Sequence, residues 1–268
     1  MSTDKKYYAG VDMGSVSIKA VVINDHRIVA SHLMASGGNY KNVAQDVLNN
    51  VLAQIGITYD QLSGIIVTGL GAESSPFAAR QASDISCQAA GCHRLFPSAR
   101  TVIDIGGQFT KVAKISSEGR VVDFLMSEKC AAGSGRFLQV IARILHIDFD
   151  DIGPLSLQSQ NPVEFSTNCA VFAESETVSR IAEGALPGDI LAGVHRSMAS
   201  KVSMLVRRLK WEPDVVLTGG TATDSGLITA INAALGVGVI VPHEPRLTAA
   251  FGAACQAEDI LGRSDADE

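Results

Sequence analysis

The chain has 268 residues, of which 46% are hydrophobic and 19% are charged, and its formal net charge at pH 7 is −6. A chain of this length and hydrophobic content can bury a large core and can form two domains. The net negative charge argues against broad electrostatic binding to nucleic acid or to an anionic membrane, so we expect proteins or small anions as partners.

The start of the chain and its cysteines indicate a reducing compartment. Residues 1–6 lead directly into an expected strand, without the apolar stretch and small-residue cleavage site of a signal peptide. No hydrophobic run approaches the length of a transmembrane helix. The five cysteines are an odd number, which favours free thiols or metal ligands over a disulfide framework. We therefore expect a cytoplasmic protein.

The first elements in chain order form a strand meander, followed by a helix and a further strand. Tight polar turns separate three short β-patterned segments, and apolar residues then recur at helical spacing. The expected strands are 7–12, 18–23, 28–30 and 65–68, and the expected helix is 40–55.

The same order of elements returns in the second half of the chain. The expected strands are 101–105, 110–115, 121–125, 215–218 and 239–241, and the expected helices are 135–145, 172–182 and 187–209. The repetition predicts two copies of a strand-meander-plus-helix unit, with the boundary near residues 96–98. The polar tail 264–268 is expected to be disordered.

The first copy has an acidic residue at a strand end, just before a hairpin of small residues. In chain order these residues are Asp12, Gly14, Ser15, Val16, Ser17 and Lys19. Such a turn presents backbone N–H groups and hydroxyls to phosphate oxygens, and Lys19 adds a positive charge. An ordinary Gly-Ser hairpin explains the segment equally well when it is taken alone.

The second copy repeats this arrangement with Asp104, Gly106, Gly107 and Gln108. A carboxylate at a strand end can hold Mg²⁺ through water, and paired glycines let the backbone approach a phosphate closely. Two such turns in equivalent positions are hard to explain by chance. The sequence therefore predicts a phosphate-binding turn in each copy.

A third turn follows the buried strand 215–218, and it could lie against an adenosine. Its residues are Gly219, Gly220, Thr221 and Thr223. A plain strand-to-helix turn is the better interpretation of this segment on its own.

Two cysteines each open an apolar, helix-like segment downstream of a glycine turn. These are Cys130 and Cys169. Two thiolates cannot complete the four-cysteine shell that iron–sulfur clusters normally need, but a twofold dimer could supply four. The other three cysteines, Cys87, Cys92 and Cys255, are interpreted as buried packing residues, because a free cysteine behaves as a small hydrophobe.

These residues carry a resemblance to known families. The two aspartate-glycine turns and the Thr-Gly-Gly turn resemble the nucleotide-binding motifs shared by actin, sugar kinases and heat-shock chaperone ATPases. Segments 129–138, 168–176 and 195–200 closely resemble the ATP-dependent activators of 2-hydroxyacyl-CoA dehydratases, to which the ATPase subunits of benzoyl-CoA reductases are related. The resemblance extends from about Tyr8 to Ala254.

The resemblance implies an α/β fold with two duplicated actin-like (ribonuclease H-like) ATPase domains and a nucleotide cleft between them. Domain I would comprise 1–97, completed by 244–263, and domain II would comprise 98–243. It also implies a homodimer that binds ATP or ADP with Mg²⁺ and holds one [4Fe–4S] cluster through Cys130 and Cys169 of each subunit. ATP hydrolysis would drive one low-potential electron from a ferredoxin or flavodoxin into a partner iron–sulfur dehydratase or reductase.

Roles for individual residues follow from the same resemblance. Phosphate or magnesium would be held by Asp12, Ser15, Ser17 and Lys19, and the metal-bound water and terminal phosphate by Asp104, Gly106, Gly107 and Gln108. Gly219, Gly220 and Thr221 would lie along the nucleotide. The chain departs from the family at Phe109, where an aspartate is usual, and at Arg246, where activators commonly carry glutamine; we expect Arg246 to contact the nucleotide. Apart from the resemblance, His195 is expected on a solvated helix face, which is the default for a polar helix residue.

Three alternatives to a dehydratase activator stay open. A relative that reduces a double-cubane cluster protein or a benzoyl-CoA reductase would use the same machinery. A small-molecule kinase of this fold would need a substrate-binding general base and no iron. A non-redox, ATP-dependent regulator is supported by Phe109, since phenylalanine cannot orient an attacking water.

Overall fold

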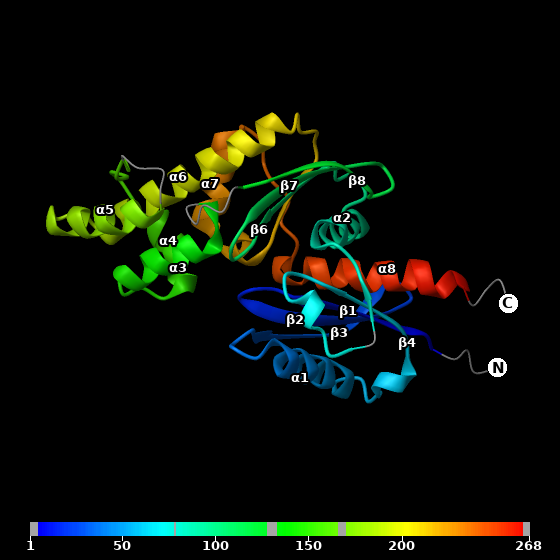
Figure 1. Ribbon diagram of the computed structural model, residues 1–268. Coiled ribbons are helices and arrows are strands. Elements are labelled where there is room, and N and C mark those ends of the chain that lie inside the picture. Colours follow the sequence, from blue (N-terminus) through cyan, green and yellow to red (C-terminus); the bar gives the residue numbers. More distant parts are fainter. Residues whose placement is uncertain (1–4, 78, 128–132, 166–169, 265–268) are drawn as a thin grey trace. The chain divides into compact units, whose positions relative to one another are not determined.

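The computed structural model describes residues 5–77, 79–127, 133–165 and 170–264. Contacts between residues divide the chain into two compact units. Unit 1 consists of Met1–Ala99, Ile115–Val121 and Arg246–Glu268, and unit 2 consists of Arg100–Lys114 and Val122–Pro245. Figure 1 shows the elements of both units.

Unit 1 is built on a five-stranded mixed sheet with the order β3-β2-β1-β4-β5. Its strands are β1 (Tyr7–Met13), β2 (Ser17–Asn24), β3 (Arg27–Ala35), β4 (Leu62–Thr68) and β5 (Arg80–Gln81). The first three strands form the antiparallel meander predicted from the sequence, and β4 pairs parallel to β1.

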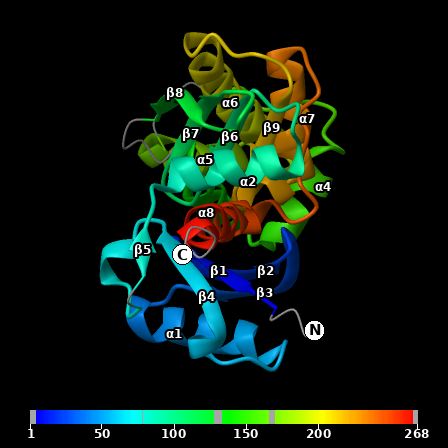
Figure 2. The ribbon, with the colours of Figure 1, turned by 90° about the vertical axis from the view of Figure 1, so that its right-hand side faces the viewer.

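Helices cover both faces of this sheet (Figures 1 and 2). They are α1 (Tyr40–Ala53), α2 (Asp84–Leu95) and α8 (Thr248–Ser264). Alternate residues of β1 point to opposite sides, so Val11 packs in the core under α1 while Tyr8 packs in the core with α8. The side chain of Asn39 caps α1 by accepting from the Asn42 N–H, 3.2 Å away.

The three cysteines interpreted as packing residues, Cys87, Cys92 and Cys255, are buried in α2 and α8, which confirms that prediction. Burial raises the pKa of the Cys87 and Cys255 thiols to about 12. These thiols therefore stay protonated at neutral pH.

Unit 2 contains a four-stranded sheet with the order β8-β7-β6-β9. Its strands are β6 (Thr101–Ile105), β7 (Thr110–Ile115), β8 (Val121–Met126) and β9 (Val215–Thr218). The pair β6–β7 is antiparallel and β6–β9 is parallel, which repeats the arrangement of β1, β2 and β4.

The predicted strand 239–241 is reduced to a single bridge between Ile240 and Val216. Two neighbours explain the difference. The N–H of Val239 donates to the side chain of Asn232, at 2.8 Å, instead of to a strand, and Pro242 has no N–H to continue a ladder.

Five helices complete unit 2 within the described residues. They are α3 (Gly135–Ile144), α4 (Ile152–Ser156), α5 (Ala170–Ala182), α6 (Pro187–Arg208) and α7 (Ser225–Leu235). The predicted helices 135–145, 172–182 and 187–209 correspond to α3, α5 and α6. Their apolar sides form one core with β6 and β9, which includes Ile103, Leu138, Val194 and Leu217.

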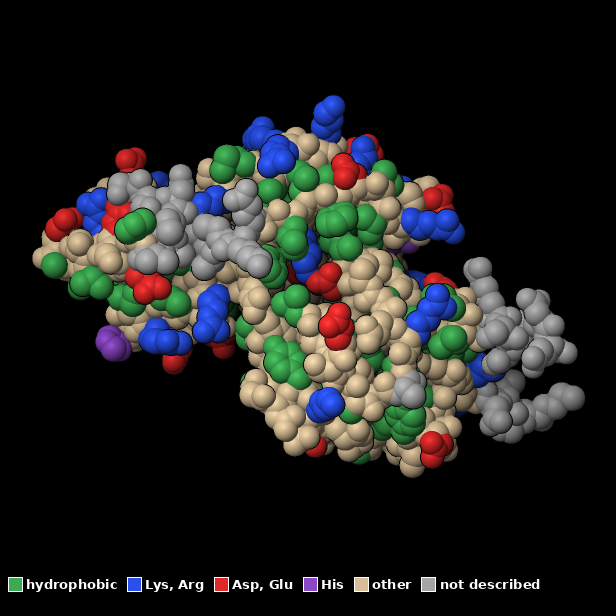
Figure 3. Space-filling view, in the orientation of Figure 1, with side chains coloured by type: hydrophobic (Ala, Val, Ile, Leu, Met, Phe, Trp, Pro, Cys, Tyr) green, Lys and Arg blue, Asp and Glu red, His purple; other side chains and the backbone are tan. Residues whose placement is uncertain are grey.

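On the face shown in Figure 3, acidic and basic side chains are interspersed and form no large patch of one charge. In the described part of the chain, none of the helices combines the length and the apolar character needed to cross a membrane.

Candidate functional site

The first candidate group lies at the end of β1. Asp12 pairs in register with Lys19 on β2, and the Lys19 Nζ donates to Asp12 Oδ2 at 2.9 Å. Gly14 lies between the strand end and the hairpin tip, and a side chain there would be crowded because its Cβ would lie 2.9 Å from the backbone carbonyl oxygen of Ser17. The hairpin therefore joins a carboxylate and an ammonium group next to its small-residue turn.

The shape of this turn is set by a residue from outside the hairpin. The Ser36 hydroxyl donates to the Gly14 carbonyl at 2.6 Å, and the Ser36 N–H donates to the Val16 carbonyl at 3.0 Å. Val16, at the tip, is exposed, and Ser15 and Ser17 beside it are partly exposed. The backbone and hydroxyls of the turn are thus held in place and accessible, as a phosphate-binding turn requires.

A glycine that the sequence analysis did not single out completes this group. Gly69 follows β4, whose Thr68 is in register with Asp12. Gly69 has a φ of +90°, and a Cβ there would lie 2.5 Å from Asp12 Oδ1. The missing side chain makes the room in which the Asp12 carboxylate sits.

Unit 2 repeats this group with Asp104, Lys111 and Gly219. Asp104 pairs in register with Lys111 on β7, with 3.8 Å between Lys111 Nζ and Asp104 Oδ2, and in parallel with Thr218 on β9. Gly219 has a φ of +93°, and a Cβ there would lie 2.5 Å from Asp104 Oδ1. The sequence prediction included Gly219 but omitted Lys111.

A repeated signal in the sequence could have found both omitted residues. Lysine follows aspartate at the same spacing in Asp12–Lys19 and Asp104–Lys111, and Thr-Gly follows a buried strand at both Thr68 and Thr218. Only the second Thr-Gly is followed directly by another glycine, so the first is the weaker signal.

The glycine turn after β6 is bonded to the start of α3. The Gly106 N–H donates to the Phe109 carbonyl at 2.9 Å, which closes the turn. The Gly106 carbonyl accepts from Gly135 N–H at 2.9 Å, and the Gly107 carbonyl accepts from Arg136 N–H at 3.1 Å. Gln108 is exposed and Phe109 is half-buried. These bonds connect the turn to the first residues of α3.

The Thr-Gly-Gly turn divides into a packed part and an exposed part. The buried Thr221 donates its hydroxyl to the Ile105 carbonyl at 3.1 Å, so this residue fixes the turn against β6. Gly220 and Thr223 are exposed, and the Thr223 hydroxyl donates to the Gly220 carbonyl at 3.2 Å. Arg246 is an exposed residue of the short helical turn Pro245–Leu247 in unit 1.

Cys130 and Cys169 lie outside the described residues, but the residues that flank them are described. Thr110 binds both sides of the Cys130 segment: its hydroxyl donates to the Gly133 carbonyl, and its carbonyl accepts from the Ser127 N–H at 2.8 Å. Helix α5 begins at Ala170, directly after Cys169. Both cysteine segments are therefore adjacent to helix N-termini.

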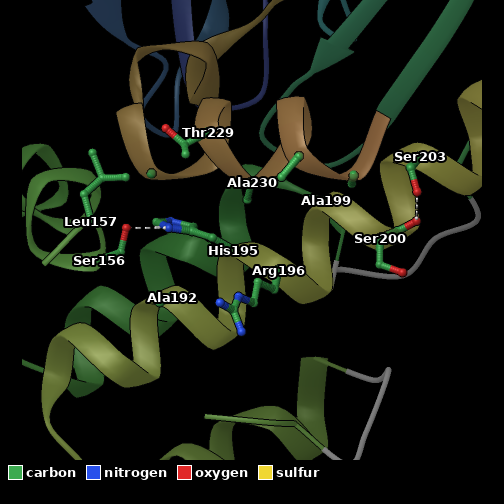
Figure 4. A pocket seen from close by; sticks show the side chains of 13 residues that line it. Ser156, Leu157, Ala192, His195, Arg196, Ala199, Ser200, Ser203, Thr229 and Ala230 are labelled. Carbon is green, nitrogen blue, oxygen red and sulfur yellow. Dashed lines mark hydrogen bonds between the residues drawn. The ribbon is translucent and has the colours of Figure 1, made fainter. Parts of the chain in front are cut away.

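The prediction of a solvated His195 is wrong, because α6 is packed against both α4 and α7 at this point. His195 is 1% exposed, with Nδ1 2.9 Å from the Ser156 hydroxyl (Figure 4). Its Nε2 lies 2.9 Å from Asp224 Oδ2. The Ser156 hydroxyl donates to the Gly153 carbonyl and Asp224 caps α7 by accepting from Gly226 N–H. Ser156, His195 and Asp224 therefore connect α4, α6 and the start of α7.

A cavity of about 630 Å³ adjoins this network between α6 and α7. Small side chains such as Ala199, Ser200 and Ala230 line most of it, with the exposed Arg196 at one side (Figure 4). It belongs to unit 2 alone and contains none of the residues predicted from the nucleotide motifs.

Comparisons with known proteins find relatives over almost the whole chain. The BadF/BadG/BcrA/BcrD ATPase family matches residues 9–257. The chain is 42% identical over 254 residues to the 2-hydroxyisocaproyl-CoA dehydratase activator of Clostridioides difficile, covering 94% of this chain and 95% of the relative. It is 39% identical over 251 residues to the activator of lactoyl-CoA dehydratase of Anaerotignum propionicum, covering 94% and 97%.

Solved structures confirm the fold class. The structure of the activator of the 2-hydroxyisocaproyl-CoA dehydratase from Clostridium difficile, with bound ADPNP, matches with a TM-score of 0.93 and 41% identity, covering 98% of each chain. A glucokinase from Streptomyces griseus, which is a sugar kinase, shares the fold at 16% identity, with a TM-score of 0.59. The match covers 94% of this chain and 99% of the kinase. The fold predicted from the sequence, an α/β actin-like ATPase fold, is thus the observed one. The extent of the family match and the identity to both activators show that the chain belongs to the BadF/BadG/BcrA/BcrD ATPase family.

Proposed function

We propose that this protein is an ATP-dependent activator that injects one low-potential electron into a partner iron–sulfur enzyme, such as a 2-hydroxyacyl-CoA dehydratase. In this proposal a homodimer shares one [4Fe–4S] cluster, held by Cys130 and Cys169 of each subunit. A reduced ferredoxin or flavodoxin supplies the electron, and ATP hydrolysis drives its transfer.

One observation carries the proposal: the glycine turn beside Asp104 is bonded to the helix that follows Cys130. The carbonyls of Gly106 and Gly107 accept from the first N–H groups of α3, and Thr110 holds both sides of the Cys130 segment. A change in this turn, as a terminal phosphate is bound or lost, is therefore passed directly to the cysteine segment. This link supports a conformational gate driven by nucleotide.

The residues of the turns fit a magnesium nucleotide. Gly69 and Gly219 leave room for the carboxylates of Asp12 and Asp104 where a Cβ would collide with them. Carboxylates at strand ends suit Mg²⁺ that keeps several waters and binds phosphate oxygens. When bound, Mg²⁺ neutralises phosphate charge, while Lys19 and the turn backbone orient the phosphates and the exposed Gln108 orients water.

Cys130 and Cys169, the two cysteines that are not packing residues, fit a cluster shared by two chains. Three of the five cysteines are buried, and burial raises the pKa of Cys87 and Cys255 to about 12, so they are poor thiolate ligands. Cys130 and Cys169 are left, two per chain, and a four-thiolate shell then needs two chains. The N-terminus of α5 directly after Cys169 favours the negative charge of a thiolate-bound cluster. The cluster, when bound, supplies one-electron chemistry.

The activator relatives support a partner enzyme of the dehydratase class. A second candidate, a nucleotide-dependent regulator without fast turnover, is favoured by Phe109. Its carbonyl closes the glycine turn, but its side chain offers no polar atom to a water or a metal ion. Nucleotide-bound protein that hydrolyses no ATP, alone or with its partner, would favour that candidate.

Iron analysis of matched variants tests the proposal. Protein purified without oxygen should contain about two irons per chain, which is one four-iron cluster per dimer. Cys130→Ala should lose the iron and keep ATP binding, whereas Asp104→Ala should keep the iron and lose ATP binding. Cys255→Ala serves as the control and should retain both. Iron retained in Cys130→Ala would refute the ligand assignment, and iron-free wild type after anaerobic reconstitution would refute the redox function.

A further inference from the structure

We infer that Lys111 is a positioning residue of the nucleotide site, which holds the Asp104 carboxylate in place as Lys19 holds that of Asp12. The inference deepens the proposed function and rests on its nucleotide site. Lys111 was absent from the motif-based assignment, and its role follows from the internal duplication of the chain.

The two units place the same kinds of residue in register with the carboxylate. Asp12 and Asp104 each occupy the strand next to a hairpin, and each is in register with a lysine on the returning strand. Each is also in register with the threonine of a Thr-Gly pair on a parallel strand, Thr68 or Thr218. Both threonine hydroxyls donate to a backbone carbonyl, at 2.9 Å and 2.8 Å. The equivalent surroundings indicate an equivalent function for the two lysines.

Asp104 has a distinct neighbour at each carboxylate oxygen. Gly219 leaves the room that Oδ1 occupies, since a Cβ there would lie only 2.5 Å away, and Lys111 Nζ stands 3.8 Å from Oδ2. The side chains of Lys111 and Asp104 are only 13% and 8% exposed, so the attraction between their charges is screened less than at a surface. Removing the ammonium would leave a buried carboxylate without this charge compensation.

The two lysines differ in their distance from the aspartate. Lys19 Nζ is hydrogen-bonded to Asp12 at 2.9 Å, whereas Lys111 lies 3.8 Å from Asp104, beyond a hydrogen bond. Lys111 therefore orients Asp104 through charge without donating to Oδ2. A carboxylate held this way suits water-mediated binding of Mg²⁺, in which the order of the carboxylate decides the affinity.

Magnesium-dependent nucleotide binding in Lys111 variants tests this role. A fluorescent ATP analogue is titrated at a series of Mg²⁺ concentrations, and unfolding is followed on the same samples. Lys111→Met should raise the Mg²⁺ concentration for half-maximal binding by about 10- to 100-fold. Lys111→Arg should restore it to within about threefold, because the charge is kept. Lys114→Met, which removes a lysine of the same strand that pairs with Glu212, should bind as wild type does.

The outcomes separate this role from its alternatives. Unchanged magnesium dependence in Lys111→Met, or an equal defect in Lys111→Arg and Lys111→Met, would overturn the positioning role. A purely structural role would lower the stability of Lys111→Met while its magnesium dependence stays that of wild type. Wild-type protein that binds no nucleotide would instead overturn the proposed function, and this role with it.

Discussion

Replacing Gly219 by alanine tests the arrangement around Asp104 most directly. With a φ of +93° and a ψ of 177°, Gly219 lies in an extended region that is open essentially to glycine alone, which costs another residue about 1–3 kcal/mol. The added Cβ would also lie 2.5 Å from Asp104 Oδ1 and 2.6 Å from the Ile105 carbonyl oxygen, and overpacking of this kind costs about 1–3 kcal/mol. The sum is about 2–6 kcal/mol, which lowers Tm by about 4–24 °C in a protein of this size.

A matched control separates backbone strain from the collision with the carboxylate. Gly236 also has a positive φ, +76°, but no heavy atom lies within 4 Å of a Cβ placed there. Gly236→Ala should therefore cost only the strain, about 1–2 kcal/mol. We expect urea unfolding to show the larger loss of unfolding free energy for Gly219→Ala. Calorimetry should show weaker ATP binding for that variant alone. Equal losses of stability with unchanged ATP affinity in both variants would refute the reasoning.

Two further predictions concern the turn after β6. Phe109→Asp places a carboxylate beside Gln108, so the rate of ATP hydrolysis should rise about tenfold or more, measured by phosphate release, while an unchanged rate would show that Phe109 does not limit hydrolysis. Thr110→Val keeps the shape of the side chain and removes its hydroxyl bond to the Gly133 carbonyl. ATP affinity should stay within about twofold, but the effect of ATP on the rate of iron chelation from the protein should be lost. A chelation rate that still responds to ATP as in wild type would argue against transmission through Thr110.

The local elements of both copies follow from the sequence because short-range patterns determine them. An antiparallel hairpin brings Asp12 beside Lys19 and Asp104 beside Lys111 through a few residues of chain, so the turn and its charged neighbours are readable from spacing. The helices α3, α5 and α6 carry regular apolar positions and were predicted within a few residues. Helix α8 carries a weaker signal, since it is buried from more than one side in the core with the sheet and shows no clear polar face.

The tertiary structure decided which distant residues meet. Gly69 and Gly219 reach the carboxylates through parallel strands, whose partners are far apart in the chain, and no local pattern specifies that register. In the sequence His195 looks like any other polar residue of α6. In the structure it is buried in contact with Ser156 and Asp224, because α4 and α7 pack against that side of the helix. By itself the sequence determined the two aspartate-glycine turns after β1 and β6, and it distinguished Cys130 and Cys169 from the three packing cysteines. Only the fold showed that each aspartate sits between a lysine and a glycine, and that one of these turns is bonded to the helix following Cys130, since those contacts depend on strand pairing and helix packing across long stretches of chain.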